Sequence, residues 1–570
     1  MTGIKAKGNS CRLSGELILH EEAPTAVDRK CGGWITFPYI IATVLGLTIT
    51  GGGLMSNLIV YLIERFNIKS IDAAQISNVV NGCTSLFPIA GAIVADSWLG
   101  SFSVIFISSI ISLLGMILLT LTVTLPSLTP PYCEKGSKCD PPTKIQLAIL
   151  YATITLVSIG LGGTRFTIAT MGADQFDKAK DQGTFFNWYF FTLYLGFLIG
   201  ATGIVYIQDN IGWGLGFGLC LAAGALGFSI FLSGKNVYRH VKPKGSSFTS
   251  LARVLIATVR KRKLSVASVS NDYYLGNNIE SKNQFITPSS SFRLLNRAAI
   301  NTESDTNEDG SIAKPWRLCT VQQVEDLKTL IHIFPLWSTS IFLSTPIGIQ
   351  SSLVVLQALT MDRHIGSHFQ VPAGSFLVFT LLSTAICLSV IDRLFFPMWQ
   401  ILAQRPLTPL QRVGFGHILN IVGMAGSALV ESRRLHAFRS HYNANQPDST
   451  VPMSAMWLVG PLAIVGVGEA FHFPGQVALY YQEFPMSLRS TATAMISLLI
   501  AVGFYLSTAL INLIRRVTVW LPDNINKGRL DNVFWLLVVI GLVNFGYYLL
   551  CAIMYRYKNV ENADDDSGIH

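Results

Sequence analysis

The chain has 570 residues, carries a formal net charge of +9, and is hydrophobic at half of its positions. Only 13% of the residues are charged, against about 25% in typical soluble domains, and the mean hydropathy is +0.45. This composition excludes a soluble domain and predicts an all-α membrane protein that crosses the bilayer many times.

The first 33 residues are polar and of mixed charge. They lack the basic start, apolar core and small-residue cleavage site of a secretory signal, so we expect a cytosolic tail and insertion through the first span.

Twelve hydrophobic segments follow, and a polar stretch over 234–327 separates the first six from the last six. The segments cover residues 34–63, 75–96, 102–126, 145–173, 184–206, 214–233, 328–358, 372–396, 411–431, 452–483, 490–514 and 531–555. This layout predicts the major facilitator architecture, with six-helix halves at 34–233 and 328–555 around a central cavity. An even number of spans puts both termini, including the tail at 556–570, on one side, which we assign to the cytosol.

Two polar loops contain candidate regulatory features. In the central loop, residues 248–265 predict a basic amphipathic helix on the inner leaflet. Ser265 follows the basic run "RKRKL" and is a candidate kinase site, although a solvated linker with incidental serines has the same pattern. Residues 271–313 have a polar composition typical of disorder. Between the third and fourth spans, Cys133 and Cys139 are either a disulfide or two free thiols.

Two charges of opposite sign lie inside equivalent spans of the two halves. Arg165 follows "GLGGT" in the fourth span, and Glu469 follows "GVG" in the tenth. A charge at the bilayer centre costs at least about 2.5–3.5 kcal/mol, so each should face a cavity or a partner. One interpretation is a salt bridge that joins the halves. The other is an anion site in which Arg165 binds a planar oxyanion and Glu469 competes for the arginine when the site is empty.

Other polar and aromatic residues of the spans are candidates for the same cavity. Asn57 and Tyr61 lie on one face of the first span, where helix–helix hydrogen bonding is the alternative role. The seventh span offers Gln350 beside a bend expected at Pro346. The tenth span adds Phe471, His472 and Gln476. The candidates for gating are Asp96, Pro346 and Asp392.

Four motifs carry a resemblance to a known family. They are "GAIVADSWLG" (91–100), "GLGGTRFTIATMGADQFD" (160–177), "FFNWYFFTLYLG" (185–196) and "GVGEAFHFPGQVALYYQEFP" (466–485). In this order they resemble the plant nitrate/peptide transporter family, a branch of the proton-coupled oligopeptide transporters. The resemblance covers essentially the whole chain and implies alternating-access transport.

The chain departs from the family pattern in its ionisable residues. The family's Glu-x-x-Glu-Arg motif of the first span falls on Val44, Leu47 and Thr48, so it is absent. Some nitrate carriers have a histidine in the seventh span, and Ile347 occupies that position here. The family often has an asparagine in the fifth span, where this chain has Tyr194. Arg165 matches the lysine common in the fourth span, and Glu469 matches the acidic residue of the tenth.

The absent motif, together with "GGWITFP" and "NLIVYLIERF" in the first span, is similar to the nitrate-excretion branch. That resemblance implies movement of nitrate or chloride, often outward across the plasma membrane, with the vacuolar membrane as an alternative. The remaining candidate proton acceptors are Glu469, His472 and His332. Two further hypotheses stay open: a transporter of a larger plant metabolite such as a glucoside or hormone, and a membrane sensor with little flux.

No metal-ligand cluster, nucleophile motif or phosphate-binding glycine loop after a strand is present in the sequence. We therefore expect no enzyme, no cofactor and no nucleic-acid partner. The expected partners are a small anion, the lipid bilayer and a kinase that acts on the central loop.

Overall fold

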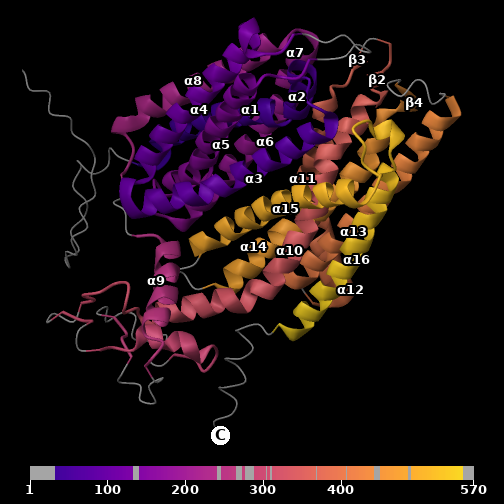
Figure 1. Ribbon diagram of the computed structural model, residues 1–570. Coiled ribbons are helices and arrows are strands. Elements are labelled where there is room, and N and C mark those ends of the chain that lie inside the picture. The colour runs from indigo at the N-terminus through magenta and orange to yellow at the C-terminus, as the bar shows by residue number, and fades with distance from the viewer. Residues whose placement is uncertain are drawn as a thin grey trace, which may run out of the picture.

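The computed structural model describes residues 32–131, 140–240, 245–264, 273–276, 288–302, 305–307, 311–367, 369–405, 407–441, 450–484 and 489–555. Within these ranges twelve helices are long and apolar enough to cross a membrane, and they coincide with the twelve predicted segments. Figure 1 shows them as two bundles, with the N-terminal half in indigo and magenta and the C-terminal half in orange and yellow.

The N-terminal half contains six spans, some of them built from two or three helical pieces. In chain order the elements are α1 (Phe37–Met55), α2 (Leu58–Phe66), α3 (Ser70–Val94) with η3 (Ala95–Leu99), α4 (Ser101–Thr124), α5 (Lys144–Ala173), α6 (Ala179–Ile199) with η5 (Gly200–Ile204) and α7 (Val205–Asn210), and α8 (Trp213–Ser233).

The C-terminal half contains the other six spans. Its helices are α10 (Val321–Leu359), η10 (Ala373–Phe376) with α11 (Leu377–Val390), η11 (Ile391–Phe395) and α12 (Phe396–Ala403), α13 (Pro409–His441), η12 (Ala455–Leu458) with α14 (Val459–Glu483), α15 (Arg489–Val517) and α16 (Leu530–Met554). Short strands connect the spans: β1 (Met361–Asp362) pairs in parallel with β4 (Val451–Ser454), and β2 (His364–Ile365) pairs antiparallel with β3 (Phe369–Gln370).

The first predicted span is broken rather than continuous. Its helix stops at Met55 and restarts at Leu58, with Asn57 outside helical geometry. The preceding glycines allow close packing, because a side chain on Gly52 would meet the backbone of Phe197 and one on Gly53 would meet Ile204. The glycine run therefore brings the helices together, while the break occurs one turn later.

Glycines before the two membrane charges also bring helices into contact. A Cβ atom on Gly160 of α5 would collide with Ser112 of α4, and one on Gly466 of α14 would collide with the carbonyl of Thr380 in α11. Both motifs thus serve tight helix packing.

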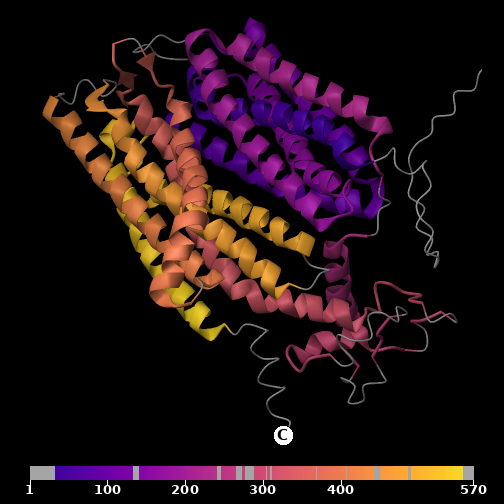
Figure 2. The ribbon, with the colours of Figure 1, turned by 180° about the vertical axis from the view of Figure 1, so that it is seen from behind.

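Most of the central loop that the structure describes folds against the C-terminal half. Helix α9 (Ser247–Arg260) and η9 (Arg293–Ala299) pack on the start of α10 through a small apolar core. Figures 1 and 2 both show α9 at one end of the molecule, which we call the loop side, and the opposite end is the far side. A helix does form in the predicted amphipathic segment, but residues 288–302 and 305–307 have a defined structure where the composition indicated disorder.

The two halves are tied together in their far-side portions. Helix α3 packs against α10 and α15 there. The polar contacts are Asn78–Ser352 at 3.3 Å, Gln75–Asn512 at 2.8 Å, Asp72–Arg515 at 2.6 Å and Lys69–Asp523 at 2.6 Å. The arrangement is therefore closed on the far side.

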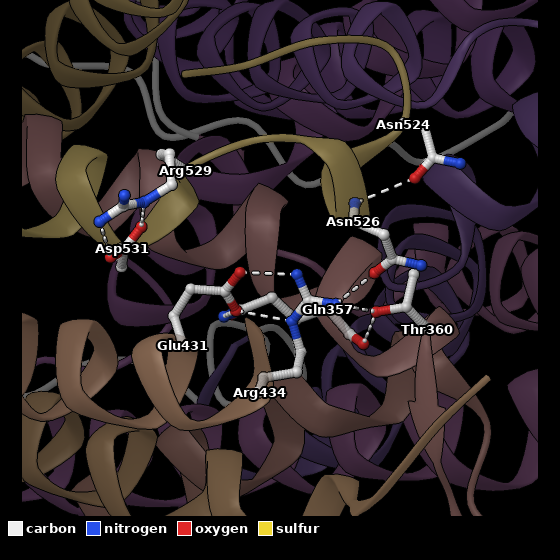
Figure 3. A network of polar contacts seen from close by, with 8 residues as sticks. All are labelled: Gln357, Thr360, Glu431, Arg434, Asn524, Asn526, Arg529 and Asp531. Atoms are coloured by element: carbon white, nitrogen blue, oxygen red, sulfur yellow. Dashed lines mark hydrogen bonds and ion pairs between the residues drawn. The ribbon is translucent and has the colours of Figure 1, made fainter. Parts of the chain in front are cut away.

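A fully buried ion pair lies at the far-side end of the C-terminal bundle (Figure 3). Arg434 donates two hydrogen bonds to Glu431, at 2.8 and 2.6 Å, and also bonds Thr360 and Asn526. Gln357 of α10 donates to Glu431 at 2.6 Å. The network joins α10, α13 and the segment before α16, and every charge in it has a partner.

Removing one member of this buried pair should destabilise the fold strongly. We expect Arg434→Met to cost about 3–5 kcal/mol, because it leaves the Glu431 carboxylate buried without its cation. Thermal unfolding in detergent measures the loss. Arg433→Met is the matched control, since Arg433 is exposed against Trp457. An Arg434→Met protein as stable as the Arg433→Met protein would contradict the role of the pair.

A second buried ion pair stabilises the central loop. Lys261 contacts Asp305 at 3.0 Å and donates to the Ile300 carbonyl at 2.6 Å. Burial alone raises the pKa of Asp305, but hydrogen bonds from Thr302 and Lys261 outweigh it, and the net pKa lies below the usual value. A carboxyl group with a depressed pKa stabilises the fold above its unfolded pKa of about 3.9 and stops doing so as the pH falls through the folded value.

The docked loop should consequently be insensitive to pH between 8 and 5 and should loosen only below about pH 4. Asp305→Asn should loosen it already at pH 7. Amide hydrogen exchange of residues 293–300, corrected for intrinsic rates, tests both statements. Asp177→Asn is the control, because that carboxylate is exposed and outside the loop. Corrected exchange that rises steadily from pH 8 to pH 5 would disprove the assignment.

Candidate functional site

A central cavity of about 260 Å³ lies between the two halves. The N-terminal half supplies most of its wall through α1, α3, α5 and α6, and the C-terminal half closes it with single residues of α10, α11 and α15. The polar or charged residues of the lining are Thr48, Ser56, Asn81, Thr84, Ser85, Thr164, Arg165, Tyr189 and Ser351.

Arg165 is the charged residue in this lining. Its side chain is exposed to the cavity side, and in the described part of the chain its guanidinium makes no hydrogen bond or ion pair. Its backbone carbonyl accepts a hydrogen bond of 2.8 Å from the Tyr189 hydroxyl, which fixes α6 against α5. The five donors of the guanidinium are therefore available to a ligand.

The positions of the absent Glu-x-x-Glu-Arg motif face the same cavity. Val44, Leu47 and Thr48 all line it. The Thr48 hydroxyl donates to the Val44 carbonyl at 2.6 Å, so it is satisfied within its own helix. The α1 wall of the cavity consequently offers no carboxylate to neutralise Arg165.

Glu469 lies on the other half and is separated from Arg165 in this conformation. It is partly buried in α14, outside the lining of the cavity, and among the described residues no ion pair joins it to Arg165. Tyr194 of α6, about a third exposed, interacts electrostatically with both charges. The salt bridge that would join the halves is thus not formed between the described residues in this conformation.

Asn57 and Tyr61 do not line the cavity and instead connect helices of the N-terminal half. Asn57 donates to Gln208 at 3.0 Å and to Asp209 at 2.8 Å, while the Tyr61 hydroxyl contacts Thr122 at 2.6 Å. Both side chains are fully buried. The helix–helix role is the one that the structure assigns to them.

The polar candidates of the C-terminal half are likewise used in packing. Gln350 donates to Ser427 of α13 at 2.8 Å, and Gln476 donates to Ser340 of α10 at 2.7 Å. Both glutamines are buried, since α10, α13 and α14 form the interior of this half. They hold the bundle together and do not reach the cavity.

Phe471 and His472 are also inside the C-terminal bundle. Phe471 packs edge-on against Phe395 at 5.2 Å, and the His472 ring lies 5.3 Å from the ring of His417. Neither lines the cavity. The placement agrees with packing as the ordinary role of aromatic residues in this span.

The gating and loop candidates have mixed outcomes. Helix α10 continues without interruption through Pro346, where the sequence predicted a bend. Asp96 lies in the π-helical end of the second span. Ile347 is half-buried and packs against the hydrophobic core. The Asp392 side chain, Ser265, Cys133 and Cys139 lie outside the described residues.

A polar stripe on α3 was missed by the sequence reasoning. Asn81, Thr84 and Ser85 line the cavity opposite Arg165's helix, and Asn78 on the same side contacts Ser352 of the other half. The signal was present as polar residues at 78, 81, 84 and 85, which are positions i, i+3, i+6 and i+7 of an apolar span, a helical periodicity.

Comparison with known proteins now adds the family. Residues 102–527 match the model described as "POT family". The NRT1/PTR FAMILY 2.7 protein of Arabidopsis thaliana is 55% identical over 557 residues, which is 97% of this chain and 98% of the relative. The NRT1/PTR FAMILY 2.6 protein of the same plant is 53% identical over 559 residues, or 97% and 99%.

Solved structures agree at the level of the fold. An auto-inhibited POT family peptide transporter superposes with a TM-score of 0.68 at 15% identity and covers 92% of this chain and 97% of its own. A POT family transporter in complex with 5-aminolevulinic acid superposes with a TM-score of 0.62 at 14% identity, and the match covers 92% of this chain and 98% of that structure. The family match and the plant relatives show that the chain belongs to the POT family. It is therefore a multi-pass membrane transporter with major facilitator architecture and not an enzyme.

Proposed function

We propose that this transporter moves nitrate, or chloride, by alternating access with weak or no proton coupling. The observation that carries the proposal is Arg165, which has no partner among the described residues, in a cavity whose α1 wall presents Val44, Leu47 and Thr48 in place of ionisable residues. A fixed cation without a neighbouring carboxylate favours an anion and leaves no obvious proton acceptor on that wall.

The size and chemistry of the cavity favour a small planar anion. Its volume of 260 Å³ is below the ~300–1,000 Å³ of sites for drug-sized ligands. The guanidinium fork matches the oxygens of a planar oxyanion two at a time, and the hydroxyl of Ser85 adds a neutral donor to the same lining. The hydroxyls of Thr84 and Thr164 donate to carbonyls of their own helices. Nitrate meets both requirements.

The direction of transport follows from the membrane potential. A carrier without proton coupling follows the gradient of its substrate. An inside-negative potential favours exit of a monovalent anion by about 2.3 kcal/mol per 100 mV. We therefore propose efflux, with the plasma membrane as the site of action.

A second candidate is a larger plant metabolite. Tyr189, Phe197 and Phe504 line the cavity, and aromatic rings can stack on a glucoside or hormone. Such a ligand needs a cavity wider than the one in this conformation. Competition of candidate metabolites against labelled nitrate separates the two proposals, and anion binding without flux would indicate a sensor.

Charge at position 165 should determine transport. We expect Arg165→Gln to lower nitrate flux at least twentyfold, because the anion loses its cation, and Arg165→Lys to retain a measurable fraction. Flux in proteoliposomes measures both. Arg433→Gln, which removes an exposed arginine outside the cavity, is the control and should transport normally.

The double variant distinguishes a binding role from a salt bridge that only joins the halves. Arg165→Gln combined with Glu469→Gln should stay inactive if the arginine binds the anion. Full recovery of flux in the double variant would show that the pair is only structural.

Nitrate efflux from proteoliposomes should increase with an imposed potential that is negative on the nitrate side and should change little with a proton gradient at fixed voltage. The reason is that the anion carries charge and the α1 wall holds no carboxylate. Uptake that rises steeply with an inward proton gradient at fixed voltage would overturn the proposed lack of coupling.

A further inference from the structure

A second and larger hollow lies on the outside of the far-side seam. It has a volume of about 680 Å³ and is formed mainly by α3 and α5, with Thr508 of α15 also in its lining. Figure 1 shows α3 and α15 adjacent to each other across the boundary of the two halves. We call this hollow the seam crevice.

The crevice arises from the way in which α3 and α5 cross. Their closest contacts are towards the loop side, where Gly162 and Gly163 of α5 lie against Phe87 and Gly91 of α3. Two straight helices that touch at one such crossing diverge beyond it. On the far side they separate, and α15 covers the gap from behind through the contact of Cys83 with the Tyr505 hydroxyl at 3.2 Å.

The lining changes character along the crevice. The mouth carries Lys69, Asp72 and Gln75, and the deeper wall is mainly apolar. The apolar residues of the lining are Ile68, Ile76, Val79, Val80, Phe87, Leu147 and Ile154. From Gln75 to Phe87 the helix rises roughly 18 Å, close to the ~15 Å of one hydrocarbon leaflet. The crevice therefore has the depth and polarity profile of a single lipid layer.

The surroundings exclude a lasting void and disfavour water. Val79 and Tyr151 of the lining are exposed, so the crevice opens sideways between the spans, where the neighbouring medium is the bilayer. An unfilled hollow forfeits dispersion contacts on every wall, and water at this depth finds few polar partners. A hydrocarbon chain is the material that fits.

The mouth selects the headgroup by carrying both signs of charge. Lys69 and Asp72 line it, and their partners Asp523 and Arg515 stand beside them. Exposed ion pairs of this kind are worth about 0–1 kcal/mol, so their members can exchange partners with a ligand. A phosphate matches Lys69, and a quaternary ammonium matches Asp72.

We propose that the seam crevice binds one molecule of a zwitterionic glycerophospholipid, with an acyl chain between α3 and α5 and its headgroup at Lys69 and Asp72. The site lies one helical turn from the central cavity, since Thr508 and Phe504 of α15 line the crevice and the cavity respectively. It also abuts the contacts that close the far side, and its headgroup competes with Asp523 and Arg515 for Lys69 and Asp72. This inference does not rest on the identity of the transported anion.

Photo-crosslinking tests the site in the full-length protein without any transport assay. The probe is phosphatidylcholine with a diazirine in its acyl chain, reconstituted with the protein in phosphatidylcholine liposomes. We expect labelling of peptides that contain Val79 and Tyr151 to exceed that of the exposed α4 residues Ile107 and Leu114 at least fivefold. Equal labelling would show ordinary annular lipid only and would overturn the proposal.

A variant that fills the crevice with a larger side chain provides a second test. Thr155→Trp places a ring in the crevice and should lower its labelling at least fivefold, whereas Ala152→Trp, on an exposed position outside the lining, should not. Equal loss with both variants would contradict the site. A phosphatidylglycerol probe that labels the crevice as strongly as phosphatidylcholine, or competition by a sterol alone, would overturn the choice of occupant. If Thr155→Trp does not fold, the comparison with α4 still decides the question.

Discussion

The absence of a partner for one guanidinium sets the chemistry of the central cavity. A cation inside a low-dielectric wall raises the local potential, and the cost of keeping it there is at least a few kcal/mol. In the described structure Arg165 receives no carboxylate from α1, because Val44, Leu47 and Thr48 occupy that wall. It receives none from Glu469 either in this conformation. Under the proposed function, an anion that enters the cavity would relieve this cost.

The same type of residue has a different role where its partners are fixed. Arg434 is fully buried and bonded to Glu431, Thr360 and Asn526, and Lys261 is buried against Asp305. Those charges are neutralised within rigid elements, and they secure the C-terminal bundle and the central loop. Arg165 differs because its potential partner belongs to the other half, and the two halves of such a transporter move relative to each other.

Close helix contacts support the position of Arg165 and also shape the hollows. The glycines of α5 bring it against α3 and α4, so that Arg165 is presented to the cavity from a tightly supported helix. Beyond the same crossing the helices diverge and leave the seam crevice. The far-side contacts of α3 with α15 close one end of the cavity and lie beside that crevice, so the closure, the crevice and the central cavity share one pair of helices.

The sequence alone determined the class of protein, the twelve spans, the division into two halves, and the two charged positions Arg165 and Glu469. These are properties of local composition and periodicity, because a span must be apolar over about 20 residues and an isolated charge within it is conspicuous. The tertiary structure alone decided which polar residues face the cavity. Asn57, Tyr61, Gln350 and Gln476 hydrogen-bond to partners more than 60 positions away, whereas Asn81, Thr84 and Ser85 face the cavity. Hydrogen-bond partners between helices depend on how the helices are rotated and how closely they pack. The order of residues along the chain does not specify either quantity.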